Sequence, residues 1–592
     1  MSGPTVAGEA RLDNRGELLR ALDQGPGERT HITDLALILR AYERWGEDCA
    51  SRLLGDFAFV VHDDRTRRVF GARDPLGVKP FYYRASAGGL AFATRASAIA
   101  EIDEGPLELD EGRIADVCVS ALECVDRTST FYLGVLRLPP GHRLTFEAGR
   151  VGVRAYWTPD PSREIRFGSD AAYAEAFREV FTEAVRCRLS GPAASMLSGG
   201  LDSSTIVGFA RAIRRADDGP ALTTLSAVTD DPGCEESRHI RAVLDLPGLD
   251  PIAIRPGDVG AFRDEIDAFV ASMEEPFDGS MLIPLLSYCA ARRRGFDAVL
   301  DGVDGDTVAS HEPNLLAGLL RSRDWGAAVR EARGFARFYD GTYDPWSTAT
   351  RLLAVNALRA VAPGFLLAAA RPFRRRRAVR ATLAESIIGR DFAERIDAAG
   401  RLRALWAHRD RSPARPPRER QAQEIVHPQI AAALERYHRV AASQGIEARH
   451  PFLDRRVVEF CLALPWDQKV RDGWSKWIVR RASAGLLPDG VRWRRGRWVR
   501  LGSRFLSAAI GQSGDFLALE LSSDMTELAA YADLAKVRAL YQRYLRGDLE
   551  AAEPIWTAAV LSSWLRKASA KRYDLAARAN GQAALPCLPL AG

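Results

Sequence analysis

A seven-residue segment of serine, glycine and aspartate, Ser198-Gly-Gly-Leu-Asp-Ser-Ser204, constrains the fold most strongly. It follows a short apolar run over 193–197 and leads into an amphipathic run over 203–216. A strand, a glycine turn and a helix in this order place the first amides of the helix beside the end of the strand, where they bind anions. Further strand-like runs at 222–228 and 298–300 alternate with helical runs, which predicts a doubly wound parallel α/β sheet.

The residue types of this segment suit the binding of nucleotide phosphates. Gly199 and Gly200 let the backbone approach a phosphate closely, and the serine hydroxyls add donors. Asp202 would repel a phosphate unless a cation lay between them, and Mg²⁺ prefers carboxylate and phosphate oxygens. The segment therefore predicts a site for ATP and Mg²⁺.

The predicted secondary structure changes along the chain. Residues 1–160 are rich in short strands, expected at 56–62, 68–71 and 89–94, and end in a proline-containing linker. The second predicted domain spans 165–575. Its stretch 308–430 is rich in arginine and alanine and is predicted to be a helical insert. The remainder of that domain is also predicted to be helical.

Composition excludes several classes of protein. The 592 residues are 47% hydrophobic and 27% charged, which is typical of a globular chain and not of a disordered or fibrous one. A net charge of +5 is too small to indicate nucleic-acid binding. The 76 arginines against six lysines indicate a compositional bias. Eight cysteines without a CxxC pair, no signal peptide and no integral membrane segment predict a soluble, cytoplasmic protein.

The serine-glycine segment resembles that of the PP-loop ATP pyrophosphatases, which cleave ATP between its α- and β-phosphates. Four further segments narrow the resemblance to the asparagine synthetase superfamily: Val299–Asp306, Gly445–Asp454, Arg471–Lys476 and Val491–Arg497. This resemblance covers nearly the whole chain.

The resemblance implies a role for individual residues. Asp202 and Asp306 would hold Mg²⁺, and Lys476 and Arg497 would be catalytic cations on the phosphates. Arg497 stands where the family has lysine, and Glu435 is a weak candidate for the general base. The ATP-binding set is Leu197, Ser198, Gly199, Gly200, Leu201, Asp202, Ser203, Ser204, Val228, Asp301 and Gly302, with Leu197 and Val228 expected at the adenine.

The N-terminal part resembles the class II glutaminase (Ntn, α+β sandwich) domain of the same family, through 54–59, 73–83 and 138–142. A working glutaminase of that class carries a nucleophilic cysteine at residue 2, where this sequence has Ser2. We therefore expect a truncated, degenerate and inactive glutaminase-like domain.

Two further differences from the superfamily pattern favour one branch of the asparagine synthetase superfamily. Val303 stands where asparagine synthetases have glutamate and β-lactam synthetases have tyrosine, and Asp306 is separated from Glu447 by 141 residues that hold the insert. Such inserts are similar to those of lasso-peptide cyclases. These enzymes adenylate an acidic side chain of a precursor peptide, and the peptide's own N-terminal amine closes a macrolactam.

This resemblance implies a precursor peptide as substrate, with a leader peptidase and a leader-recognition protein as partners. The arginines of the insert would bind carboxylates of the peptide. Asparagine synthase activity, a β-lactam-synthetase-like ligase and an inactive scaffold subunit remain as alternatives.

Overall fold

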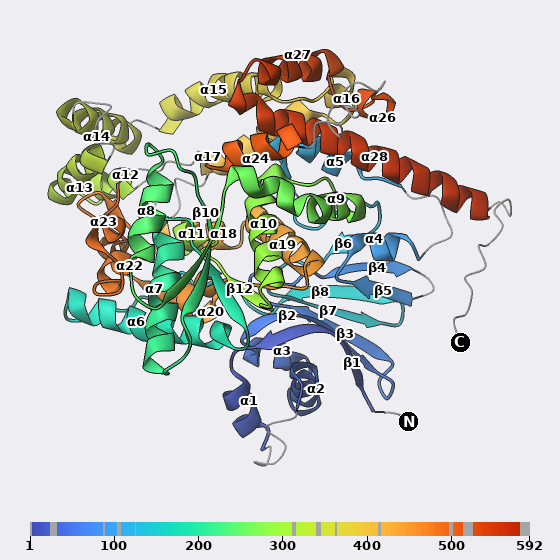
Figure 1. Ribbon diagram of the computed structural model, residues 1–592, viewed down its shortest axis with the longest axis horizontal. Helices are drawn as coiled ribbons and strands as arrows, with labels where there is room; N and C mark the ends of the chain where they lie inside the picture. Colours follow the sequence, from blue (N-terminus) through green and yellow to red (C-terminus); the bar gives the residue numbers. More distant parts are fainter. Residues whose placement is uncertain are drawn as a thin grey trace.

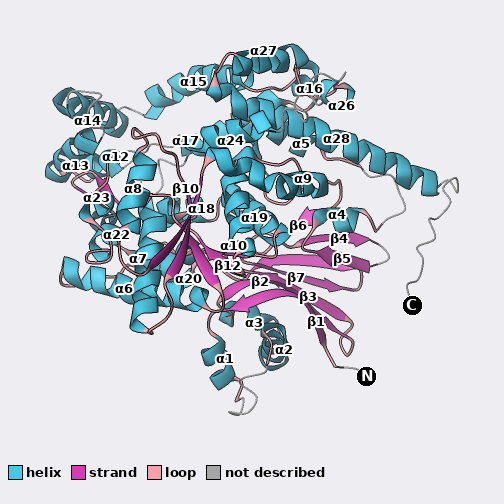
Figure 2. Cartoon of the chain, in the orientation of Figure 1, coloured by secondary structure: helices cyan, strands magenta, loops and turns pink. Residues whose placement is uncertain are grey.

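A computed structural model describes residues 3–23, 32–86, 89–102, 108–124, 126–310, 315–338, 345–361, 364–411, 416–495, 501–512 and 525–579. Within these residues, an antiparallel β unit at the N-terminus lies against a larger α/β unit, and helices of the insert and the C-terminus cover the latter (Figure 1). Figure 2 shows the two groups of strands side by side.

The N-terminal unit holds two antiparallel sheets. The first has the order β1 (Thr5–Leu12), β2 (Gly55–Asp63), β3 (Arg68–Arg73), β7 (His142–Glu147) and β8 (Arg150–Ala155). The second has the order β5 (Gly89–Ala93), β4 (Tyr82–Ser86) and β6 (Leu136–Arg137). Alternate residues of β2 point to opposite faces: Phe57 and Phe59 join a cluster with α2 (Asp34–Trp45), while Ala58 and Val60 join a cluster with residues of both sheets. The first sheet is therefore covered on both faces.

The larger unit is built on a five-stranded parallel sheet of the order β11-β10-β9-β12-β13. The strands are β9 (Ala193–Met196), β10 (Leu222–Ala227), β11 (Leu249–Ile254), β12 (Ala298–Leu300) and β13 (Glu447–Arg449). One buried cluster includes residues of α6 (Asp170–Arg186), α7 (Leu201–Ala216) and α8 (Glu235–Leu244). Another includes residues of α10 (Leu282–Arg293) and α19 (Pro428–Ser443). The predicted doubly wound parallel sheet is confirmed.

The insert is helical as predicted, and it lies in two places (Figure 1). The helices α12 (Leu315–Arg321), α13 (Trp325–Phe338) and α14 (Pro345–Val361) lie near α22 (Trp477–Ala482) and α23 (Asp489–Arg492). The helices α15 (Gly364–Glu385), α16 (Arg390–Arg395) and α17 (Ala398–Arg411) lie near α27 (Leu534–Leu545) and α28 (Ala552–Ala579). The chain returns through α18 (Pro417–Ile425) and α19 to β13.

Several elements differ from the sequence-based expectation. The sequence does not predict β1, β4, β6, β7, β8, β11 or β13, nor the two-residue strands β14 (Val470–Arg471) and β15 (Trp474–Ser475) of a small hairpin. Strands β1, β8, β11 and β13 lie at sheet edges, and β11 contains Pro251, which central strands exclude. Trp556 and Trp564 of the C-terminal helix are buried, at 1% and 2% exposure. Across the described residues, no helix combines the length and the apolar character needed to cross a membrane.

Candidate functional site

The serine-glycine segment forms a tight loop between β9 and α7. The amide of Ser198 donates to the Ser203 hydroxyl at 3.1 Å, and the two hydroxyl oxygens lie 2.9 Å apart. Gly199 has a left-handed φ of +71°, and a Cβ there would lie 2.7 Å from the Glu236 carbonyl oxygen, so only glycine fits. The loop turns the first amides of the 16-residue α7 toward the carboxyl end of the sheet, where they favour an anion.

A second loop, after β12, packs directly against the first. Cβ atoms built at Gly302 and Gly305 would lie 2.7 Å from the Ser203 amide nitrogen and 2.5 Å from the Asp202 carboxyl carbon. Asp301 is buried and accepts a hydrogen bond from His450 Nδ1 at 2.7 Å. Burial lowers the pKa of His450, but Asp301 more than offsets it, so the net pKa is raised and the imidazole is held as a donor. Asp301 is thus a support of the loop.

Lys476 joins the two loops. Its ammonium nitrogen lies 2.5 Å from Asp202 Oδ2 and 2.8 Å from Asp306 Oδ1. It follows a hairpin of β14 (Val470–Arg471) and β15 (Trp474–Ser475), and it has a left-handed φ of +53°, rare for a residue with a Cβ. The two aspartates predicted to hold Mg²⁺ and the predicted cation therefore form one cluster.

The aspartates of this cluster fit a divalent cation. Asp202 Oδ1 is buried and has no hydrogen-bond partner among the described residues, while Asp306 is half exposed. Burial raises the pKa of Asp202, and Lys476 offsets this only in part. An orphaned buried carboxylate oxygen beside a second carboxylate is a donor set that suits Mg²⁺.

Of three further predicted residues, the structure describes Leu197 and Val228 but not Arg497. Leu197 and Val228 follow β9 and β10 and are buried in one apolar cluster, so their predicted contact with adenine remains a prediction. Arg497 lies outside the described residues.

Two arginines near the loop were not singled out from the sequence. Arg494 donates to the Gly199 carbonyl oxygen, and Arg480 donates to the carbonyl oxygens of Ser475 and Arg492 at 2.8 and 2.6 Å. Burial is the main cause that lowers the pKa of Arg480 to about 10, and Asp202 counters it. The segment Val491–Arg497 contains Arg494, but the arginine-rich composition concealed which of its arginines contacts the loop. Arg480 lies outside that segment and had no comparable local signal.

The assignment of Glu435 as a candidate base needs correction. It lies 1% exposed between the two units, and it accepts hydrogen bonds from Arg73, Arg137 and Tyr82 at 2.7–2.8 Å. Burial raises the pKa of this carboxyl, but Arg137 and Arg73 more than offset it, and the net pKa is lowered. A carboxylate held in this way links the two units and is not available to accept a proton from an amine.

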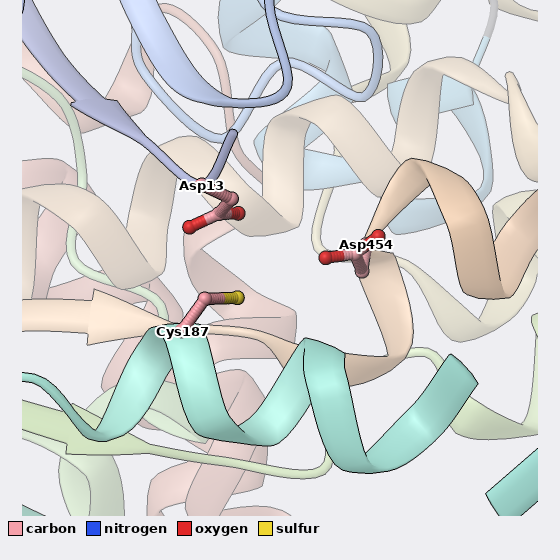
Figure 3. Close-up of side chains that lie close together, drawn as sticks. All are labelled: Asp13, Cys187 and Asp454. Atoms are coloured by element: carbon pink, nitrogen blue, oxygen red, sulfur yellow. The ribbon is translucent and has the colours of Figure 1, made fainter. Parts of the chain in front are cut away.

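Asp13, Cys187 and Asp454 also lie close together, from three separate segments (Figure 3). Arg188 lies 3.2 Å from Asp13 and 2.7 Å from Asp454. Arg11 also pairs with Asp13, and Arg456 lies 2.7 Å from Asp454, so both carboxylates are already neutralised. Burial raises the pKa of Cys187 to about 12, which keeps a proton on the thiol. This cluster is an ion-pair network between the two units and not a metal site.

Two cysteines of the N-terminal unit are poor nucleophiles. Cys49 and Cys118 are 0% and 4% exposed, and burial raises the pKa of each to about 12. Because the thiolate is the reactive form, neither residue replaces a glutaminase nucleophile.

Comparisons with known proteins agree with this geometry. The asparagine synthase family profile matches residues 176–566, and a glutamine amidotransferase domain profile matches residues 9–157. A Bacillus subtilis protein named asparagine synthetase [glutamine-hydrolyzing] 3 is 25% identical, over 83% of this chain and 74% of its own length. Another from the same organism, named asparagine synthetase [glutamine-hydrolyzing] 1, is 21% identical over 91% and 82%. The Penicillium rubens amidase chyE is 29% identical over 49% and 45%. The antiparallel N-terminal unit and the parallel α/β unit accordingly correspond to an amidotransferase-like and a synthetase domain.

Proposed function

The chain belongs to the asparagine synthase family, and on that premise we propose that its synthetase site adenylates a carboxylate with ATP and passes the acyl group to an amine. In general terms the protein is an asparagine synthetase-like, ATP-dependent, amide-forming ligase. The observation that carries the finer proposal is the cluster of Asp202, Asp306 and Lys476 beside the anion-binding start of α7.

The reaction follows from the weakness of a carboxylate as an acyl donor. A carboxylate oxygen attacks the α-phosphorus of ATP, the bond to the β-phosphate oxygen breaks, and pyrophosphate leaves. The amine then attacks the acyl carbon, loses a proton and expels AMP. The loop amides at Ser198–Ser204 bind pyrophosphate oxygens, and Lys476 places a positive charge where negative charge develops.

Family members generally use ATP with Mg²⁺, and Asp202 and Asp306 are the residues that would hold the ion. Mg²⁺ bound there would neutralise charge on the phosphates.

Two substrate pairs fit this reaction. The names of the relatives support aspartate as the acyl donor and ammonia as the acceptor, an amide synthesis on a small molecule. The helical insert supports a peptide instead, with an acidic side chain as the donor and the peptide's N-terminal amine as the acceptor. In either case, the buried thiols of Cys49 and Cys118, whose pKa values are raised, are not candidates for releasing ammonia from glutamine.

Pyrophosphate release from ATP and Mg²⁺ separates these candidates. The assay is run with aspartate plus ammonium, with aspartate plus glutamine, and with a linear peptide carrying an acidic residue near position 8. Release in at least one arm is expected, and that arm identifies the substrate pair. Absence of release in all three would contradict the proposal and leave an inactive scaffold.

The variant Asp202→Asn tests the site itself. We expect it to reduce pyrophosphate release at least about 100-fold, a loss of about 3 kcal/mol of transition-state stabilisation. Asp267→Asn, which removes an exposed carboxylate paired with Arg263, is the matched control and should retain release within about twofold. Equal pyrophosphate release by the two variants would show that Asp202 has no role in the reaction.

A further inference from the structure

A cavity of about 510 Å³ lies between α13 of the insert and the hairpin that leads to Lys476. Four of its lining side chains are arginines: Arg330, Arg333, Arg337 and Arg495. Trp474 and Asp472 of the hairpin segment complete the polar part of the wall. Arg330 is paired with Glu331 at 3.4 Å and with Asp472 at 3.6 Å. Four guanidinium groups near two carboxylates still leave a net positive charge at the cavity, which favours an anionic ligand.

The arginines of α13 are placed by helical periodicity. Residues 326, 329, 330, 333, 334 and 337 line the cavity, and this spacing puts them on one face of the helix. The alanines at 327, 328, 332 and 336 are buried on the other face. Arginines three and four residues apart repel one another by about 0.2–0.5 kcal/mol per pair. The helix is therefore amphipathic, with its alanines packed against the protein and its arginines on the face that lines the cavity.

The helix is fixed to the hairpin by close contact. Glu331 is fully buried and accepts a hydrogen bond from the Gly473 amide at 2.9 Å. A Cβ built at Gly334 would lie 2.0 Å from the carbonyl carbon of Asp472, so only glycine allows this approach. The cavity is therefore a fixed part of the fold and keeps its position relative to Lys476.

The cavity is adjacent to the reaction site along the chain. Trp474 in its wall precedes Lys476 by two residues, a span of about 7 Å in extended chain. On the opposite side, Arg495 follows Arg494, which donates to the Gly199 carbonyl of the phosphate-binding loop. Arg480 and Arg495 also lie 4.9 and 5.5 Å from the Trp474 ring. An extended peptide with one carboxylate at Lys476 could thus place a neighbouring acidic group in the cavity.

We propose that this cavity binds a second acidic group of a peptide substrate whose first carboxylate is activated beside Asp202, Asp306 and Lys476. The proposal rests on the adenylation proposed above and specifies its substrate class. The volume of the cavity falls in the range of about 300–1,000 Å³ typical of ligand pockets and exceeds the needs of a single carboxylate. The cavity selects for peptides with an acidic residue close to the activated one.

Fluorescence anisotropy with two labelled octapeptides tests this binding. One peptide carries three glutamates, and the other carries glutamines at the same positions. The full-length protein should bind the glutamate peptide at least tenfold more tightly, and the difference should shrink as salt rises because the contacts are ionic. Equal binding of the two peptides, or no binding of the glutamate peptide, would overturn the proposal.

Variants locate the binding to the cavity. Arg333→Gln combined with Arg337→Gln should weaken binding of the glutamate peptide at least tenfold and leave the glutamine peptide unaffected. Arg390→Gln with Arg403→Gln removes the same charge from exposed positions outside the cavity and should leave both peptides unaffected. Equal loss in the two double variants would show that binding follows net charge, and the cavity would be excluded.

Binding is measured without ATP turnover, so failure here is distinguishable from failure of the adenylation proposal. Pyrophosphate release with aspartate and ammonium, but no binding of the glutamate peptide, would overturn the role proposed for the cavity. The proposed ligase activity would stand. Binding of the glutamate peptide that depends on Arg333 and Arg337, without pyrophosphate release in any arm, would support the cavity as a binding site. It would overturn the proposed adenylation activity.

Discussion

At the scale of single residues, the buried charged side chains of Lys476 and Glu435 differ in what they contact and in the role that follows. Lys476 adopts a left-handed backbone conformation that costs about 1–2 kcal/mol for a residue with a Cβ, and this directs its ammonium at Asp202 and Asp306. Such local strain is typical of a group that the surrounding structure holds for function. Glu435 is fully paired with arginines and a tyrosine between the two units, which is typical of a structural ion pair.

The buried ion pairs of Glu435 with Arg73 and Arg137 lead to a prediction about stability. Glu435→Gln leaves Arg73 and Arg137 buried without their counter-charge, and breaking a buried pair in this way costs about 3–5 kcal/mol. We expect the thermal unfolding midpoint to fall by several degrees in differential scanning fluorimetry. Activity per folded molecule should persist because the residue does not accept the proton.

The control for this substitution is Glu394→Gln, which removes an exposed partner of Arg390 and should leave the midpoint within about one degree. Loss of turnover in Glu435→Gln without any loss of stability would restore the general-base assignment.

At the scale of elements, α18 positions the loop that carries Asp306. The Gln421 side chain donates to the carbonyl oxygens of Thr307, Val308 and Ser310, at 3.3, 2.8 and 3.1 Å. Lys469 donates to Gln421 Oε1 at 2.6 Å and is 1% exposed. A helix at the end of the insert thus supports the short helix α11 (Gly305–Ala309), which begins beside Asp202.

The buried lysine makes stability depend on pH. Burial lowers the pKa of Lys469 to about 7, below the 10.5 of an exposed lysine. Between those values the unfolded chain binds one more proton than the folded chain, so this group makes stability rise as the pH rises from about 7 toward 10.5. In Lys469→Met this contribution is absent, and the unfolding midpoint should rise less over that interval than in the unaltered protein.

The comparison is made between pH 7 and pH 9.5, in the same buffers for both proteins. Lys536→Met provides the comparison. The pKa of Lys536 is also lowered by burial, but this lysine is only part-buried, so its variant should change the pH dependence less than Lys469→Met does. Parallel pH curves for the unaltered protein and Lys469→Met would contradict the assigned pKa.

At the scale of the whole molecule, the two units share one core. A single buried cluster includes Ile114 and Phe131 of the N-terminal unit with Leu285 and Trp564 of the larger unit. The rings of Phe131 and Trp564 lie edge to face at 5.2 Å. Ion pairs from Arg188 to Asp13 and from Arg73 to Glu435 reinforce this interface. The N-terminal unit therefore stabilises the synthetase domain even if it hydrolyses no glutamine.

Removal of the N-terminal unit should expose that shared core. We expect residues 165–592 expressed alone to be insoluble, or to elute as aggregates in size-exclusion chromatography, because large apolar surfaces favour association. Co-expression of residues 1–164 as a separate chain should restore a soluble complex. A soluble, monomeric fragment with an unfolding midpoint near that of the full chain would contradict this interpretation.

Local signals made much of this architecture predictable. The strand–turn–helix unit at Ser198–Ser204 and the strand before Asp301 follow from apolar runs and glycine spacing, and both are confirmed. The contact of Lys476 with Asp202 joins residues 274 positions apart, and the family resemblance named both residues without predicting their pairing. Glu435 was misjudged because its partners, Arg73 and Arg137, belong to the other unit, and no local pattern encodes such a contact.

The order of the strands has a consequence for biosynthesis. Strand β12 pairs with β13, and Val299 lies opposite Ala448, which the chain reaches 149 residues later. At elongation rates of about 5–20 residues per second, the ribosome delivers β13 roughly 7–30 s after β12. The nascent chain carries an open sheet edge for that interval, and open edges recruit foreign strands. The yield of folded protein should therefore depend on how quickly the insert is translated and on which chaperones shield that edge.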